Sequence, residues 1–142
     1  KFPVWLDMIR SQERRRLGTW PAHLGMNDDF VGWFSLKKSI LFKNEIEIGY
    51  RLKRKFWNQG YAMEGVKHLL GYTFESLKLA KVISHTLAEN ARSVRVMEKA
   101  DMKLESHFKY PEEFVPMFED GERDARKYSL HLSEWKGLQA GP

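Results

Sequence analysis

The chain has 142 residues, of which 42% are hydrophobic and 13% aromatic, a composition that excludes an intrinsically disordered protein. A net charge of +5 favours anionic partners, and the absence of cysteine excludes disulfides, thiolate metal sites and cysteine nucleophiles. No apolar run is long enough to cross a membrane and no signal peptide opens the chain, so we expect one cytoplasmic domain over residues 1–142.

The first segment has the spacing of an amphipathic helix. Apolar residues recur at helical steps from Val4 to Leu17, and Gly18 follows where such a helix would end. The arginines at 14–16 predict a solvated cationic face, with a polyanion-binding patch as the alternative.

Three strands are predicted next. Thr19–Leu24 and Phe30–Lys37 are apolar, aromatic-rich runs on either side of a turn-forming segment, which predicts a hairpin. Glu45–Leu52 alternates with period two, which predicts a strand with one buried face. That face is formed by Ile46, Ile48, Tyr50 and Leu52. The three strands together would form an antiparallel meander.

A basic, glycine-bearing turn leads from the third strand into the most periodic segment of the chain. Its cationic side chains are Arg51, Lys53, Arg54 and Lys55, and Asn58-Gln59-Gly60 follows them. From Ala62 to Leu77, apolar residues recur at three- and four-residue steps, which predicts a helix with one buried stripe. Such a turn places backbone N–H groups at the positive end of a helix dipole, so it predicts a phosphate or pyrophosphate site. The spacing is neither a Walker loop nor a dinucleotide fingerprint.

The remaining segments continue the alternation of strand and helix. Lys81–Leu87 is short and β-branched, and we expect it to pair in parallel with the preceding strand because a helix connects the two. Asn90–Ala100 is a second helix, whose first residue is placed as its N-cap. Leu104–Tyr110 and Asp124–Leu132 are the last strands, and Pro111–Arg123 between them is a long loop rich in acidic and aromatic residues.

Two stretches carry a family resemblance: E-I-G-Y-R-L at residues 47–52 and W-N-Q-G-Y-A-M-E-G at residues 57–65. Together they resemble the acetyl-CoA signature of the GNAT-superfamily acetyltransferases, and more narrowly the ribosomal-protein-alanine N-acetyltransferase branch. Gly60 and Ala62 fit the last two marked positions of the pattern Q/R-x-x-G-x-G/A. Trp57 stands where glutamine or arginine is usual.

The resemblance continues through Asn90, Ser93 and the final strand, and it implies an α+β (α/β/α) fold of the GNAT type. This fold is a mixed, mostly antiparallel twisted sheet flanked by helices. In the family, the third and fourth predicted strands part and form a V that admits the pantetheine arm. The chain opens at Lys1 without the first strand and first helix that relatives carry, so we expect a fragment or a shortened domain. Asp101 stands where relatives usually carry glycine, and aspartate tolerates the left-handed conformation expected there.

The resemblance also implies where acetyl-CoA binds. Backbone N–H groups of the turn would hold the pyrophosphate, and the cationic side chains would add electrostatic attraction. The residues expected to contact the coenzyme are Ile48, Tyr50, Leu52, Lys53, Arg54, Asn58, Gln59, Gly60, Tyr61, Ala62, Asn90 and Ser93. The histidines show no ligand spacing, so no metal is expected.

Glu47, in E-I-G-Y, is implied as the general base beside the acetyl group, and partial burial would raise its pKa towards working pH. Glu45, on the same face of the strand, is the second candidate. Met97 stands where many relatives carry a tyrosine acid, so Ser93 or a water it holds is expected to protonate the leaving thiolate. Asn90 would bind the pantetheine arm or a catalytic water.

The implied reaction moves an acetyl group from acetyl-CoA to a primary amine, either a protein N-terminus or a small molecule. Because the chain has no cysteine, an acetyl-cysteine intermediate is impossible and direct transfer in a ternary complex is expected, with an acyl-serine intermediate as the alternative. A backbone N–H around Ile48–Tyr50 would hold the oxyanion, and Tyr61 and Tyr128 are alternative acids. Carboxylates of the loop Pro111–Arg123 would suit a cationic acceptor.

A binding protein is the competing class. The chain would then be an acyl-CoA sensor without activity or a basic nucleic-acid-binding module. For the enzyme, the expected partners are acetyl-CoA and an amine acceptor, without a membrane or nucleic acid, and a homodimer is left open.

Overall fold

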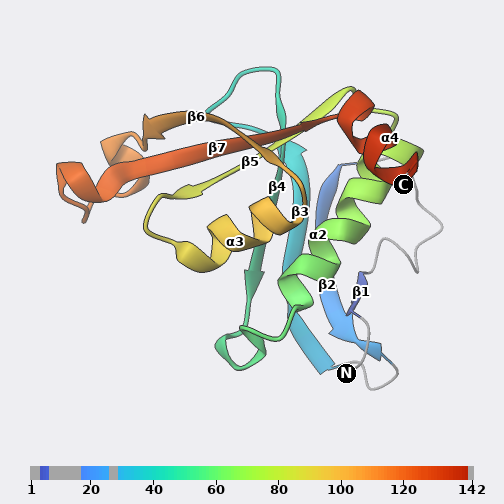
Figure 1. Ribbon diagram of the computed structural model, residues 1–142. Coiled ribbons are helices and arrows are strands. Elements are labelled where there is room, and N and C mark those ends of the chain that lie inside the picture. Colours follow the sequence, from blue (N-terminus) through green and yellow to red (C-terminus); the bar gives the residue numbers. More distant parts are fainter. Residues whose placement is uncertain (1–3, 7–16, 26–28, 141–142) are drawn as a thin grey trace.

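The computed structural model of the chain describes residues 4–6, 17–25 and 29–140. In this part of the chain, seven strands form one sheet in the order β1-β2-β3-β4-β5-β7-β6 (Figure 1). The strands are β1 (Val4–Leu6), β2 (Gly18–Leu24), β3 (Asp29–Lys38), β4 (Ile46–Leu52), β5 (Lys81–Leu87), β6 (Lys103–Lys109) and β7 (Asp124–His131). Strands β4 and β5 pair in parallel, and the other neighbouring strands pair antiparallel. The mixed, mostly antiparallel sheet, the meander β2–β4 and the parallel β4–β5 pair are therefore confirmed.

The start of the chain differs from the prediction. Val4–Leu6 is a strand that pairs antiparallel with β2, and β2 begins at Gly18. The predicted helix over Val4–Leu17 is therefore wrong at its first turn, and so is the expectation that no strand precedes the hairpin. β-branched and aromatic residue types prefer strands to helices, and this preference outweighs the weak helical pattern of the segment. The rest of that predicted helix, with its arginines at 14–16, lies outside the described residues.

In the part of the chain that the structure describes, three α-helices accompany the sheet: α2 (Tyr61–Gly71), α3 (Ala91–Lys99) and α4 (Leu132–Ala140). A π-helical turn at Tyr72–Ser76 continues α2, and inside it the hydroxyl of Thr73 donates a hydrogen bond to the carbonyl of Leu69 at 2.7 Å. Asn90 caps α3, as predicted, by accepting a hydrogen bond from the backbone N–H of Ser93 at 3.2 Å. Helix α4 was not predicted.

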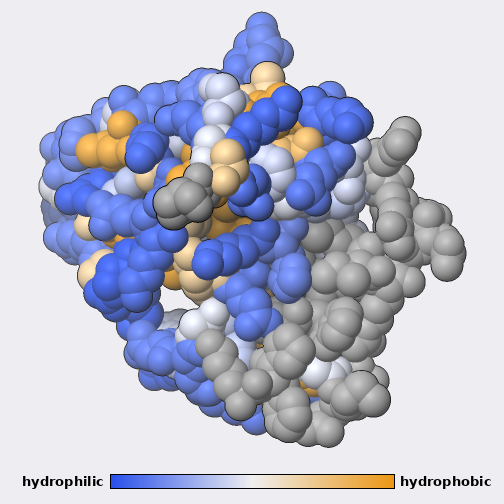
Figure 2. All heavy atoms as spheres, turned by 45° about the vertical axis from the view of Figure 1, so that its right-hand side comes forward, coloured by the Kyte–Doolittle hydropathy of each residue, from blue (hydrophilic) through white to orange (hydrophobic). Residues whose placement is uncertain are grey.

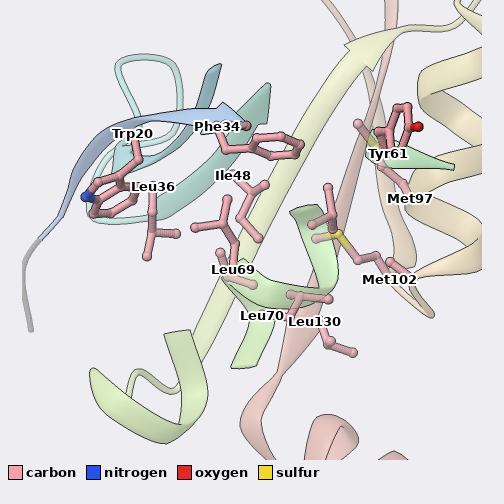
Figure 3. Packing of buried hydrophobic residues seen from close by; sticks show 14 of the residues in the cluster. Trp20, Phe34, Leu36, Ile48, Tyr61, Leu69, Leu70, Met97, Met102 and Leu130 are labelled. Atoms are coloured by element: carbon pink, nitrogen blue, oxygen red, sulfur yellow. The ribbon is translucent and has the colours of Figure 1, made fainter. Parts of the chain in front are cut away.

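The core lies between the sheet and the helices α2 and α3. Figure 3 shows side chains from β2, β3, β4, β7, α2 and α3 converging there. Phe34, Leu36, Leu69 and Leu130 are completely buried, and Ile48 is 3% exposed. The predicted apolar stripe of α2 faces this core through Val66, Leu69, Leu70 and Phe74. The opposite face of β4 therefore carries Glu47, on the side of the sheet away from α2.

Figure 2 shows a largely hydrophilic face with small, separate hydrophobic patches. Exposed large apolar side chains include Ile40 and Met117, which are 82% and 90% exposed. None of the helices in the described part of the chain has the length and apolar run that a membrane span needs.

Candidate active site

Strands β4 and β5 meet at one point and then separate. Their matched pair is Glu47 with Ile83, and the hydroxyl of Ser84 donates a hydrogen bond to the carbonyl of Ile48 at 3.0 Å. Beyond this point Figure 1 shows β4 and β5 running in different directions. The end of β4, from Gly49 to Leu52, is thus freed from β5 while it stays paired with β3. The structure has the V that the resemblance implies.

A pocket of about 470 Å³ opens beside this divergence. The end of β4, the connection to α2, the first turn of α2 and one face of α3 form its walls. The lining residues are Tyr50, Arg51, Leu52, Phe56, Trp57, Asn58, Gly60, Tyr61, Ala62, Met63, Asn90, Arg92, Ser93, Arg95, Val96 and Lys99. A volume of this size lies within the range of small-molecule and cofactor sites.

The turn before α2 has the backbone conformation of an anion site. Gly60, the N-cap of α2, has φ 83°, and Asn58 has φ 61°, so both lie in the left-handed region. Because the N-cap residue Gly60 has no side chain, it makes no side-chain hydrogen bond to the N-terminus of α2. The first N–H groups of the helix and its positive dipole end therefore face the pocket, where Gly60 and Ala62 leave room for a ligand close to the backbone.

Trp57 is held at the edge of the pocket by three contacts. Its indole Nε1 donates a hydrogen bond to the carbonyl of Leu52 at 2.9 Å. The guanidinium of Arg92 lies 4.0 Å from the centre of the ring, and that of Arg54 lies 5.3 Å from it. These contacts fix the side chain that replaces the usual glutamine or arginine of the signature.

Helix α3 supplies cations that the sequence analysis did not include. Arg92, Arg95 and Lys99 all line the pocket, at the three- and four-residue steps that place side chains on one helix face. That spacing is visible in the sequence, but which face of α3 meets α2 depends on the fold. Together with Arg51, they make the pocket strongly cationic.

Tyr50 and Ser93 meet across the pocket. The hydroxyl of Tyr50 donates a hydrogen bond to Oγ of Ser93 at 3.4 Å, which joins β4 to the first turn of α3. Burial raises the pKa of the Tyr50 phenol, and this outweighs the opposing effects of Ser93 and Arg92, so the hydroxyl keeps its proton. Ser93, the predicted acid, therefore lies beside a second hydroxyl that can donate.

The structure brings eight of the predicted coenzyme-contacting residues to the pocket: Tyr50, Leu52, Asn58, Gly60, Tyr61, Ala62, Asn90 and Ser93. Four others do not line it. The side chain of Ile48 lies in the core, and the amide of Gln59 donates a hydrogen bond to the carbonyl of Lys55 at 2.8 Å. The ammonium of Lys53 lies over the ring of Phe30. Arg54 contacts the ring of Trp57 but is not itself one of the residues that line the pocket.

Glu47 lies on the other face of the sheet, where its carboxylate contacts His85 and His85 in turn contacts Tyr110. Its Oε2 is 2.7 Å from Nε2 of His85 on β5, off the line of an ideal hydrogen bond, and Nδ1 of His85 is 2.7 Å from the hydroxyl of Tyr110. Burial alone would raise the pKa of Glu47, but His85, Ser39 and Lys37 outweigh it, and the pKa is lowered. The predicted rise of this pKa is therefore wrong, because the sequence does not show the partners that stabilise the ionised carboxylate.

Glu45, the second candidate base, is tied into a quartet of charges. Its carboxylate oxygens lie 2.7 Å from the ammonium groups of Lys81 and Lys127. Both lysines also contact Glu105 on β6, at 2.7 and 2.5 Å. Burial would raise the pKa of Glu45, but the two lysines lower it overall. The Glu45 carboxylate therefore helps to hold β5, β6 and β7 to the start of β4.

The alternative acid Tyr128 does not reach the pocket. It is 1% exposed, and its hydroxyl lies 3.4 Å from Oε2 of Glu98. Among the described residues, no group of three His, Cys, Asp or Glu side chains is arranged to hold a metal ion.

Comparisons with known proteins agree with this geometry. Residues 3–103 match the family described as "Acetyltransferase (GNAT) domain". The chain is 35% identical to the FsC-acetyl coenzyme A-N(2)-transacetylase of Aspergillus fumigatus over 130 residues, which are 86% of this chain and 53% of that protein. It is 38% identical to the uncharacterized N-acetyltransferase YnaD of Bacillus subtilis over 90 residues, 63% of this chain and 52% of that protein. The chain therefore spans about half the length of these curated relatives.

Solved structures share the fold. The acetyltransferase (GNAT family) from Bacillus anthracis has a TM-score of 0.69 at 31% identity, over 82% of this chain and 67% of that chain. The spermidine N-acetyltransferase from Vibrio cholerae, solved in complex with CoA and spermine, has a TM-score of 0.68 at 18% identity, over 83% of this chain and 67% of that chain, a likeness of fold alone. With its diverging β4–β5 pair and a family match that covers more than half of its length, the chain belongs to the GNAT family of acetyltransferases.

Proposed function

We propose that this protein transfers an acetyl group from acetyl-CoA to a primary amine, directly and within a ternary complex. The observation that carries the proposal is the cationic pocket at the divergence of β4 and β5, which the N-terminus of α2 and the basic face of α3 enclose. The names of the relatives, a coenzyme A-dependent transacetylase and N-acetyltransferases, support it.

The residues of the pocket fit coenzyme A. The N–H groups from Asn58 to Ala62 suit the pyrophosphate, and Arg92, Arg95 and Lys99 suit phosphate oxygens. The pantetheine arm would run between β4 and α3, past Asn90 and Ser93, so that the thioester reaches the apex of the V.

At the apex, the amine would attack the thioester carbonyl, and a backbone N–H around Ile48–Tyr50 would stabilise the oxyanion. Ser93, which the Tyr50 hydroxyl supports, would protonate the leaving thiolate. Glu47, on the opposite face of β4, would receive the acceptor beside its carboxylate.

Coenzyme binding is the first test. Coenzyme A at 100 times its Kd should stabilise the protein by about 2.7 kcal/mol, visible as a rise in Tm. The double substitution Arg92→Ala and Lys99→Ala should weaken binding, while Lys136→Ala on α4, away from the pocket, should not. A protein that coenzyme A leaves unchanged, but that binds nucleic acid with a steep salt dependence, would belong to the binding class instead.

Thiol release with a panel of amines is the second test. The panel contains peptides with free N-termini, for the ribosomal-protein-alanine branch, and small amines and polyamines, for the relatives named above. We expect one class to be acetylated, and Glu47→Gln to lower kcat by about 10²-fold or more. A protein that binds coenzyme A and acetylates none of these amines would be a sensor.

A further inference from the structure

Glu47, His85 and Tyr110 form a continuous chain of polar contacts. Oε2 of Glu47 is 2.7 Å from Nε2 of His85, and Nδ1 of His85 is 2.7 Å from the hydroxyl of Tyr110. The three residues come from β4, β5 and the segment after β6, so the fold alone brings them together. The side chains of Glu47 and His85 are only 12% and 15% exposed.

Aromatic rings surround the imidazole. The rings of Phe42, Phe108 and Tyr110 have their centres 5.9, 6.1 and 5.6 Å from that of His85, and Phe42 and Phe108 also contact each other. Both backbone polar groups of Tyr110 are bonded to Arg123, at 3.0 and 2.9 Å, which fixes the tyrosine at the base of its loop. The contacts among Glu47, His85 and Tyr110 are therefore held in place, and the surrounding aromatic rings provide a low-dielectric environment that strengthens them.

The other charged groups on this face have partners of their own. Lys37 on β3 and Ser39 act on Glu47, and Lys127 on β7, the cross-strand neighbour of His85, lies over the ring of Phe42. The remaining charges, Glu45, Lys81 and Glu105, neutralise one another and Lys127 in the quartet. Glu47 is therefore the carboxylate that is directed at the imidazole.

These contacts determine the proton positions. The Glu47 carboxylate lies 2.7 Å from Nε2 of His85, without ideal hydrogen-bond alignment, and favours the tautomer that carries its hydrogen on Nε2. In that tautomer Nδ1 accepts a hydrogen bond from the Tyr110 hydroxyl. Burial and the charge of Glu47 raise the pKa of Tyr110, so its hydroxyl is protonated at rest. The order carboxylate, imidazole, hydroxyl is that of a catalytic triad, with a phenol in place of the serine.

We propose that Glu47, His85 and Tyr110 together take up the proton that the substrate ammonium loses in the reaction. This proton ends on His85. In this step an N–H bond of the ammonium breaks as its proton passes to the Tyr110 oxygen, and the phenol proton passes to Nδ1 of His85. The result is a neutral amine, a neutral tyrosine and an imidazolium that the Glu47 carboxylate stabilises. The inference rests on the proposed function and changes the role of Glu47 from base to partner of the base.

Kinetics over pH provide the test, with the amine that the panel identifies. His85→Gln and Tyr110→Phe should each lower kcat by about 10²-fold or more and leave the KM for acetyl-CoA unchanged. Each should also abolish the ascending limb of the pH profile, that is, the rise of kcat with increasing pH in the wild-type protein. His131→Gln is the matched control, because His131 also contacts a carboxylate, Glu134 at 3.0 Å, on the exposed surface away from the site. It should behave as the wild-type protein does.

Tyr110→Phe keeps the ring packing and removes one oxygen, so it carries the test if His85→Gln fails to fold. A rate loss with the wild-type ascending limb retained would mean that these residues only support the fold. Either that result or unchanged rates in both variants would overturn the proposal, and Glu47 would then take the proton directly.

A second readout does not depend on activity. Two-bond ¹H–¹⁵N correlations of the histidine rings should show His85 protonated at Nε2, with Nδ1 as an acceptor that loses its partner in Tyr110→Phe. A ring protonated at Nδ1 in the neutral wild-type protein would overturn the relay even if acetyl transfer is observed. If no amine is acetylated, the proposed function fails, and the tautomer still reports on the chain of contacts.

Discussion

Gly65 lies where helix α2 crosses the ring of Phe34. A Cβ at this position would lie 2.1 Å from the tip of that ring, and Phe34 is completely buried. Gly65→Ala should therefore destabilise the protein by about 1–3 kcal/mol, because the ring must leave its place in a packed core. Urea unfolding of the variant and the wild-type protein measures the difference.

Gly71, six residues further along α2, provides the matched control. A Cβ there would meet no atom within 4 Å, and the residue already has helical dihedrals, with φ −58°. Gly71→Ala should stabilise the protein by about 0.4–1 kcal/mol through the lower entropy of the unfolded chain. Equal effects of the two substitutions would show that packing against Phe34 is not the cause.

Residues of the pocket could be predicted where the sequence places them in one continuous motif. Gly60, Ala62 and Asn90 belong to such motifs, and each lines the pocket. Arg92 and Tyr110 were not predicted as site residues, because their roles depend on which helix face meets α2 and which loop folds over β5. The partners of Glu47 also reversed the direction of its predicted pKa change.

At the scale of one element, α3 depends on its N-cap. Asn90 accepts the backbone N–H of Ser93 and lines the pocket, so a single side chain fixes both the helix start and the position of the predicted acid. Asn90→Ala should cost about 1 kcal/mol of stability and weaken coenzyme A binding, whereas Asn90→Ser or Asn90→Asp should preserve the cap. Thermal unfolding with and without coenzyme A separates the two effects. A loss of stability that serine and aspartate do not restore would contradict the capping role.

Among the strands and α-helices of the described residues, β1 and α4 were not predicted from sequence patterns. Strand β1 has three residues and exists through its pairing with β2. Helix α4 contains Gly137 and has no fully buried residue, but Trp135 packs on Phe74 with ring centres 5.4 Å apart. Strand β1 and helix α4 are both stabilised by tertiary contacts, and the periodicity of the local sequence does not predict such contacts. The longer elements, with strong periodicity, were predicted within a few residues of their observed ends.

At the scale of the whole molecule, the quartet of Glu45, Lys81, Glu105 and Lys127 joins the residue just before β4 to β5, β6 and β7. Burial would raise the pKa of Glu105, but hydrogen bonds from Lys127, Lys81 and Ser129 lower it from 4.5 to about 2. A carboxylate with a depressed folded-state pKa stabilises the protein above its unfolded pKa. This stabilisation should be present above pH 4.5 and lost as the pH falls towards 2.

Glu105→Gln tests that dependence. The variant should be less stable at pH 7 by about 1–2 kcal/mol, between the ranges for exposed and buried pairs, and the difference should shrink as the pH falls. Denaturant unfolding between pH 2.5 and pH 7 measures it. Glu75→Gln, at an exposed carboxylate in the π-helical turn after α2, serves as control and should change stability by less than about 0.5 kcal/mol. A constant difference across this range would contradict the assignment.

The single matched pair between β4 and β5 has a mechanical consequence. The sheet consists of two antiparallel blocks, β1–β4 and β5–β7, that share few main-chain hydrogen bonds. Because each block keeps its own ladder of strand pairs, a change in the angle between the blocks would disturb the ion pairs of Lys81 and Lys127 with Glu45 before it broke either ladder. In the proposed function, this angle would set the width of the gap that the acetyl group enters.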